Sequence, residues 1–191
     1  MNLRATLAIL DMRLRAETRT LAFACATALV VGIVAPQGLA GPVFFCSLLG
    51  IIVALIQSPG RFPHLDSCEQ AAPLYGRQLA RAKALVPCAI VTLATFAYVA
   101  AAIFGGLRDV PQTLFAAIAA AIPSTLAALS ATIRTGPSRL LYVGIACATS
   151  AAAFTLVVVA HSLAGALAFS ALASFLALRQ YGEALARYDP V

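Results

Sequence analysis

The sequence predicts an all-α, polytopic membrane protein that forms a single transmembrane domain over residues 1–191. Of its 191 residues, 62% are hydrophobic and only 10% are charged, whereas about a quarter of the residues in a soluble domain are charged. A soluble fold of this size has too little interior to hide so many apolar side chains. Long stretches without Asp, Glu, Lys or Arg cover residues 20–60, 84–107, 110–133 and 140–178.

Residues 2–19 have a different pattern. Leucines recur at helical spacing, at positions 3, 7, 10 and 14, while most of the charged residues lie elsewhere around the helix. This pattern predicts an amphipathic helix that lies in the membrane interface. The alternative is an ordinary extension of the first span.

Six spans follow from the lengths of the apolar stretches, because one helical crossing needs about 20 residues. The two middle stretches give one span each, and the two outer stretches give two each. The first outer stretch breaks at residues 35–38, which include Pro36 and Gly38, and the last breaks near His161. The predicted spans are 21–36, 42–58, 84–105, 111–133, 139–159 and 162–178.

The basic residues predict the orientation of these spans. Only Arg108, of the 13 Lys and Arg residues, falls on one side of the six-span arrangement, and all the others fall on the opposite side. Cytoplasmic segments of membrane proteins carry an excess of Lys and Arg. Both termini are therefore expected in the cytoplasm, and the chain in a bacterial cytoplasmic membrane. The net charge of +6 is explained by these flanking residues, and no nucleic-acid partner is expected.

Residues 61–83 are the only long polar segment, and they lie on the predicted cytoplasmic side. Asp66-Ser67 followed by Glu69-Gln70 resembles a helix start with a capping box. Pro73 and Gly76 then interrupt this helix, and a second helical run is expected to begin near residue 77 and continue into the third span. The segment is much longer than a tight connection, so we expect it to act as a coupling segment that meets a soluble partner. The alternative is a charged loop that only sets the orientation of the spans and binds no partner.

Several chemistries have no signature in the sequence. Apart from Arg139, the first residue of the fifth span, the predicted spans contain no Asp, Glu, Lys or Arg, and ion-coupled transporters usually keep such residues in their spans. The chain has no P-loop motif, no zinc-protease motif and no nucleophile elbow. The five cysteines form no C-x-x-C pair, so no metal site is expected. His161 is interpreted as an interfacial residue solvated by water, with a haem-ligand role as the alternative.

The layout resembles that of the membrane subunits of type-2 ABC exporters. The resemblance extends to a motif of the segment between spans two and three, which here reads Glu69-x-x-x-Pro73-Leu74-Tyr75-Gly76-Arg77-x-Leu79-x-x-x-Lys83. The chain is also similar to the haem-exporter B subunits of cytochrome c maturation. The matching segments are Cys68-Glu69-Gln70, Pro73-Leu74 and Arg134-Thr135-Gly136.

The resemblance implies a permease with a separate ATPase. Partner docking would then involve the positions that match the motifs, namely Glu69, Pro73, Tyr75, Arg77, Lys83 and Arg134. It also implies P-loop ATPase subunits that hold ATP and Mg, a second permease copy or a homologue, and no cofactor in this chain. The expected substrate is lipid-like or hydrophobic, with haem as one candidate. A membrane scaffold or assembly subunit that does not transport is the alternative function.

Overall fold

The computed structural model describes residues 3–34, 38–57, 61 and 76–186, and these residues are almost entirely helical, with no strand among them. The helices run in chain order as α1 (Leu3–Ala16), α2 (Thr18–Val34), α3 (Ala40–Ile56), α5 (Gly76–Phe104), α6 (Val110–Thr132), α7 (Pro137–Phe154), the π-helical turn η1 (Thr155–Val159) and α8 (Leu163–Ala186). The predicted all-α fold class is confirmed.

Four of these helices are long and apolar enough to cross a membrane by themselves. They are Leu79–Phe104, Val110–Thr132, Pro137–Val159 and Leu163–Ala186. A fifth candidate is the pair formed by α2 and the second half of α1, which bends by 68° at their junction. Helix α3 is apolar but has only 17 residues. The molecule therefore has the helices of a membrane protein, while the number of six spans stays a prediction.

Every predicted span overlaps a helix, and two helices extend beyond the predicted limits by eight residues each. The sixth span was expected to end at residue 178, but α8 continues to Ala186. Helix α5 begins at Gly76 and runs without a break to Phe104, as expected for a helical run that enters the third span. The short helix expected near Asp66 lies outside the described residues.

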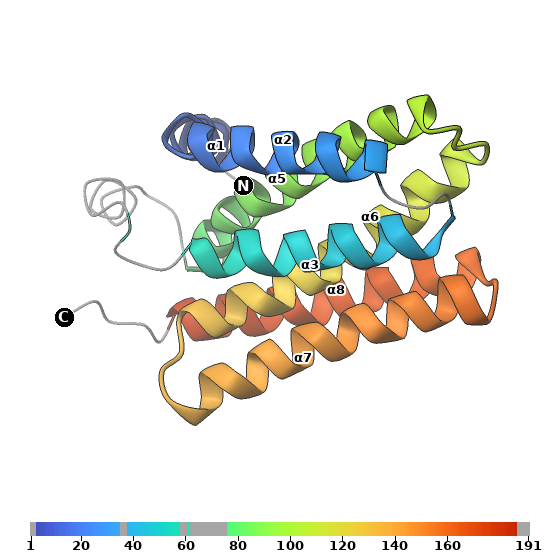
Figure 1. Cartoon of the computed structure of the whole chain (residues 1–191). Coiled ribbons are helices and arrows are strands. Elements are labelled where there is room, and N and C mark those ends of the chain that lie inside the picture. The colour runs from blue at the N-terminus through green and yellow to red at the C-terminus, as the bar shows by residue number, and fades with distance from the viewer. Residues whose placement is uncertain (1–2, 35–37, 58–60, 62–75, 187–191) are drawn as a thin grey trace.

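The helices from α2 to α8 form a bundle in which α6 is the central helix (Figure 1). Helix α6 packs against α3, α5, α7 and α8, and 78% of its apolar span is buried. Alanines make this central position possible, because small residues let membrane helices approach closely. Where α3 packs on α6, a Cβ added to Gly50 would lie 3.1 Å from the carbonyl oxygen of Ala121 and even closer to the Thr125 hydroxyl.

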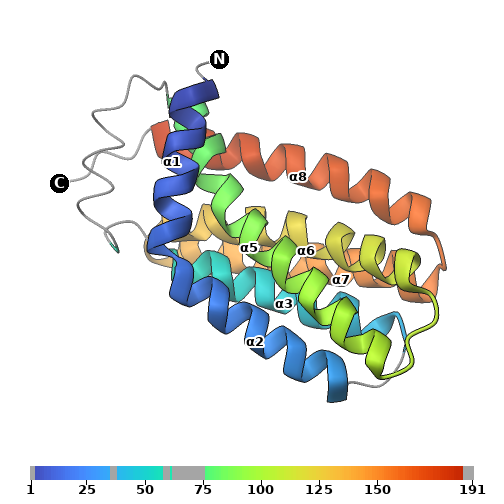
Figure 2. The same ribbon diagram turned by 90° about the horizontal axis from the view of Figure 1, so that it is seen from above.

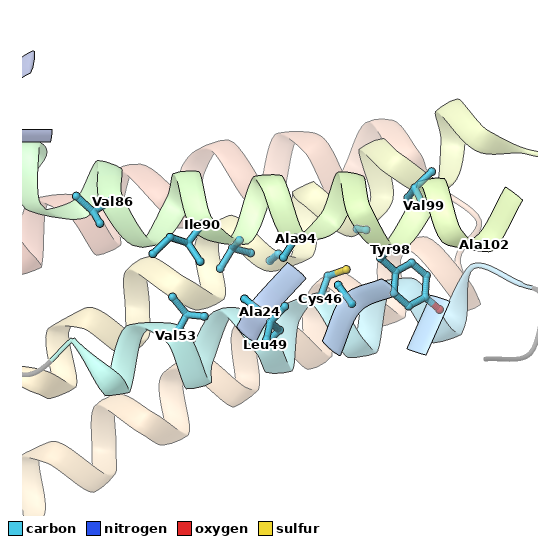
Figure 3. Packing of buried hydrophobic residues seen from close by; sticks show 14 residues of the cluster. Ala24, Cys46, Leu49, Val53, Val86, Ile90, Ala94, Tyr98, Val99 and Ala102 are labelled. Carbon is cyan, nitrogen blue, oxygen red and sulfur yellow. The ribbon is translucent and has the colours of Figure 1, made fainter. Parts of the chain in front are cut away.

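Larger side chains fill the space between α2, α3 and α5. Figure 3 shows residues of α3 facing α5, with Val53 near Ile90 and Cys46 near Tyr98. The rings of Phe45 and Tyr98 stack with their centroids 5.4 Å apart. This cluster joins the N-terminal helices to the rest of the bundle.

Helix α1 lies across one end of the bundle, where it packs mainly on α5 (Figure 2). The same end holds the C-terminal ends of α3, α6 and α8 and the N-terminal ends of α5 and α7 (Figure 1). Residues far apart in sequence therefore meet there.

Candidate functional site

We call this end of the bundle the basic end, because it gathers most of the described Lys and Arg residues. Those residues are Arg4, Arg13, Arg15, Arg19, Arg61, Arg77, Arg81, Lys83, Arg134, Arg139 and Arg179. Arg108 lies in the turn between α5 and α6, at the opposite end. The fold thus gathers, at one end of the bundle, the basic residues that the sequence predicts to lie on one side of the membrane.

Half of the predicted docking residues cannot be placed. Glu69, Pro73 and Tyr75 lie outside the described residues. Arg77 belongs to the first turn of α5, although its side chain is outside the description. Lys83 lies about two turns into α5 and is half-buried. Arg77 and Lys83 therefore lie at the basic end, in the first part of α5, and α5 continues from there to the opposite end of the bundle.

Arg134 follows α6 directly, and contacts within the chain hold its guanidinium. Its Nη1 donates a hydrogen bond to the carbonyl oxygen of Ser130 at 2.8 Å, and the guanidinium lies over the ring of Tyr142, 3.6 Å from the ring centroid. A cation at the C-terminal end of a helix is also stabilised by the helix dipole. Gly136 completes the turn in a left-handed conformation, with φ of 63°. Arg134 therefore joins the end of α6 to the beginning of α7 and stabilises the turn between them.

The sequence did not predict the polar cluster formed by Glu17, Thr20 and Arg61. Glu17 lies at the α1–α2 junction and is 2% exposed. Its Oε2 accepts a hydrogen bond from the Thr20 hydroxyl and pairs with Nη1 of Arg61 at 3.4 Å. Arg61 also donates to the Thr20 hydroxyl at 3.3 Å and to the carbonyl oxygen of Ile56, at the end of α3, at 3.3 Å. One arginine therefore joins the α1–α2 junction to the end of α3.

This cluster lies where the polar segment 61–83 begins. Arg61 is the first residue of that segment, so the segment begins at a position held by the α1–α2 junction. Glu17 precedes α2 by one residue, where a carboxylate also suits the positive end of the helix dipole. A signal was present in the sequence, because Glu17 is an acidic residue just before the first apolar stretch. Its partner could not be inferred, since Arg61 is brought to it only by the packing of the helices.

His161 lies at the opposite end, in the turn between η1 and α8. The residue is exposed and has a φ of 49°. Beside it, the Ser162 hydroxyl accepts a hydrogen bond from the backbone N–H of Gly165 at 3.1 Å and so caps the start of α8. This turn lies where the last apolar stretch was predicted to break, and His161 within it is exposed.

Within the described part of the chain, no three His, Cys, Asp or Glu side chains gather closely enough to hold a metal ion. No protein-family model, no curated protein and no solved structure matches this chain. The charges and geometry of the basic end are therefore the basis for assigning a function.

Proposed function

We propose that the chain is the membrane-spanning permease subunit of an ATP-driven ABC exporter in a bacterial cytoplasmic membrane. Helices α2, α3, α5, α6, α7 with η1, and α8 would each cross the bilayer, while α1 would lie in the cytoplasmic interface. Two copies, or one copy and a homologue, would pair in the bilayer. Two separate P-loop ATPase subunits would bind ATP with Mg and dock beneath them.

The observation that carries this proposal is the basic end itself. It brings together α1, the beginning and end of segment 61–83, and the α6–α7 turn. Positive charge on one side of a membrane protein marks the cytoplasmic side, which is where an ATPase would be available. The proposed docking surface is made by Glu69, Pro73, Tyr75, Arg77 and Lys83, with Arg134 beside them.

Helix α5 supplies a route from this surface to the bilayer. It runs unbroken for 29 residues from Gly76 and packs against α1, α2, α3, α6 and α8. A push on segment 61–75 would therefore act on one rigid element that contacts most of the bundle. The ion pair of Glu17 with Arg61 would carry the same movement to α1. Rigid-body rocking of this kind is a common way to open a path between subunits.

The proposed substrate class follows from the apolar helices. Helices α7 and α8 are the least buried of the four long spans, with 22% and 11% of their apolar windows covered by the chain. Their outward faces are thus free for lipid or for a second subunit. A path between such faces, with no charged side chain, would suit a lipid-like or hydrophobic molecule, with haem as one candidate, better than a free ion.

The test is association with the ATPase. The full chain is purified from its native membrane, the co-purifying P-loop ATPase is identified by mass spectrometry, and its ATP hydrolysis is measured. In the triple variant Glu69→Ala, Tyr75→Ala and Arg77→Ala, we expect the affinity for the ATPase to fall by about tenfold or more. Loss of one charged or aromatic anchor at an interface commonly costs about 1–2 kcal/mol.

A matched control removes the same kinds of side chain at the opposite end. The variant Phe104→Ala, Arg108→Ala and Asp109→Ala also loses one aromatic, one basic and one acidic residue, and its association should be unchanged. A stable native complex that contains no ATPase would contradict the proposal. That outcome would favour the alternative function, a scaffold or assembly subunit.

A further inference from the structure

A cavity of about 400 Å³ opens between α5 and α8 at the basic end. The described residues that line it combine two guanidinium groups with apolar side chains, and they are Arg81, Phe175, Leu178, Arg179 and Gly182. Ala80 and Ala84 of α5 belong to the same buried cluster as Ala177 and Tyr181 of α8, so the two helices are packed together near the cavity. The cavity therefore lies over a packed floor at the end of two long apolar helices.

The charge of the cavity is positive. Among the residues that the structure describes, no carboxylate pairs with Arg81. Arg179 pairs with Glu183, one turn further along α8, with Nε and Oε1 3.0 Å apart, and both side chains are exposed. This contact uses one of the five N–H donors of the Arg179 guanidinium. Two cations next to one carboxylate leave an excess of positive charge for an anion.

An exposed apolar strip leads from this positive mouth along α8. Leu172, Phe175 and Arg179 follow each other at spacings of three and four residues, which places them on one face of the helix. Leu172 is 60% exposed and Phe175 is 65% exposed. On α5, Leu85 lies one turn beyond Arg81 and is also exposed. The basic groups thus lie near the helix end, and the apolar side chains lie towards the bundle centre. A lipid has the matching arrangement, with a polar headgroup followed by apolar acyl chains.

We propose that this cavity binds an anionic phospholipid. The phosphodiester of the headgroup lies between Arg81 and Arg179, and the acyl chains lie along Phe175 and Leu172. Guanidinium groups form charge-assisted hydrogen bonds to phosphate oxygens, and basic pockets between membrane helices bind anionic headgroups. A zwitterionic lipid would bring its own ammonium group towards two arginines. The site goes beyond the proposed transport function and does not depend on the ATPase.

Native mass spectrometry of the full chain in a nonionic detergent tests this proposal. The protein is titrated with phosphatidylglycerol, with phosphatidylcholine of the same acyl chains, and with glycerol phosphate. We expect phosphatidylglycerol to be retained preferentially and glycerol phosphate not to displace it at equal concentration. Equal retention of the two lipids would overturn the proposal. Displacement by glycerol phosphate would show a site for free phosphate and would also overturn it.

A pair of double variants locates the site. Arg81→Gln with Arg179→Gln should lower retention of phosphatidylglycerol by about tenfold, because each basic group contributes to headgroup binding. Arg19→Gln with Arg139→Gln removes the same charge from the same end of the bundle and should leave retention unchanged. The Lys pair, Arg81→Lys with Arg179→Lys, keeps the charge and should keep the lipid preference. If the Arg19 and Arg139 variant lost as much phosphatidylglycerol retention as the Arg81 and Arg179 variant, the lipid would not be bound at this cavity.

Discussion

Glu17 shows what one buried charge does in this chain. Its carboxylate is 2% exposed, whereas Arg61 keeps about a third of its side chain in contact with solvent. Removing the partner of a buried charge costs several kcal/mol in a dry interior, and contact with water lowers that cost. The pair therefore acts as a joint that holds the α1–α2 junction against the end of α3.

This joint leads to the first stability prediction. Arg61→Gln should destabilise the protein by about 1–3 kcal/mol, because Glu17 keeps its charge but loses its cation. Glu17→Gln together with Arg61→Gln should recover part of that loss, since no buried charge remains. Thermal unfolding of the purified variants in detergent measures both.

Arg15→Gln is the matched control. It breaks the ion pair of Arg15 with Asp11, whose side chains are 79% and 62% exposed, and exposed helical pairs contribute only about 0.3–0.5 kcal/mol. A loss in Arg61→Gln no larger than in Arg15→Gln would show that the Glu17 joint has no structural role.

Contacts between single residues were the least predictable level of the molecule. Thr20 and Arg61 are 41 residues apart, and nothing in their sequence surroundings connects them. The stacking of Arg134 on Tyr142 likewise depends on how α6 turns into α7. Such contacts require the packing of whole helices to be known first. The three docking residues Glu69, Pro73 and Tyr75 remain sequence predictions, because they lie outside the described residues.

At the scale of elements, hydropathy located the helices and some of their ends, but not the end of α8. Predicted and observed starts of α3 and α6 differ by two residues or fewer, because Pro and Gly around these stretches end the apolar pattern close to where the helix begins or ends. Helix α8 exceeds its predicted end by eight residues (from 178 to Ala186). Hydropathy marks the apolar part of a helix, and Arg179 and Glu183 continue the same helix with an i,i+4 pair.

Helix α1 gives a prediction at the same scale. If α1 lies in the interface, spin labels at positions 7 and 14, which share the leucine face, should have nearly the same depth in a bilayer. As an extension of the first span, it would place them up to about 10 Å apart in depth, since a helix rises about 1.5 Å per residue. Power-saturation EPR of single-cysteine variants, with the native cysteines replaced by Ala, measures the depths.

Labels on α2 calibrate this measurement. Phe23 and Val30 are both exposed, and seven residues of an upright helix should separate their depths by about 10 Å. A depth difference between positions 7 and 14 as large as that between positions 23 and 30 would contradict the interfacial position of α1 and favour the alternative, an extended first span.

At the scale of the whole molecule, the sequence predicted the division of charge but not the arrangement of helices. The one-sided distribution of Lys and Arg required only the order of apolar and polar segments. The central position of α6 and the route of α1 across the bundle end (Figure 2) depend on which small residues face one another. The sequence contains many alanines in several helices, so composition alone could not select α6 for the centre.

The central claim is that the basic end faces the cytoplasm and that both termini lie there with it. Reporter fusions measure this directly, with insertion points after Val191, within segment 62–75 and at Arg108. We expect the first two fusions to read as cytoplasmic and the third as external, because the chain would cross the membrane once between segment 62–75 and Arg108 and three times between Arg108 and Val191. A cytoplasmic reading at Arg108, or an external one after Val191, would contradict it.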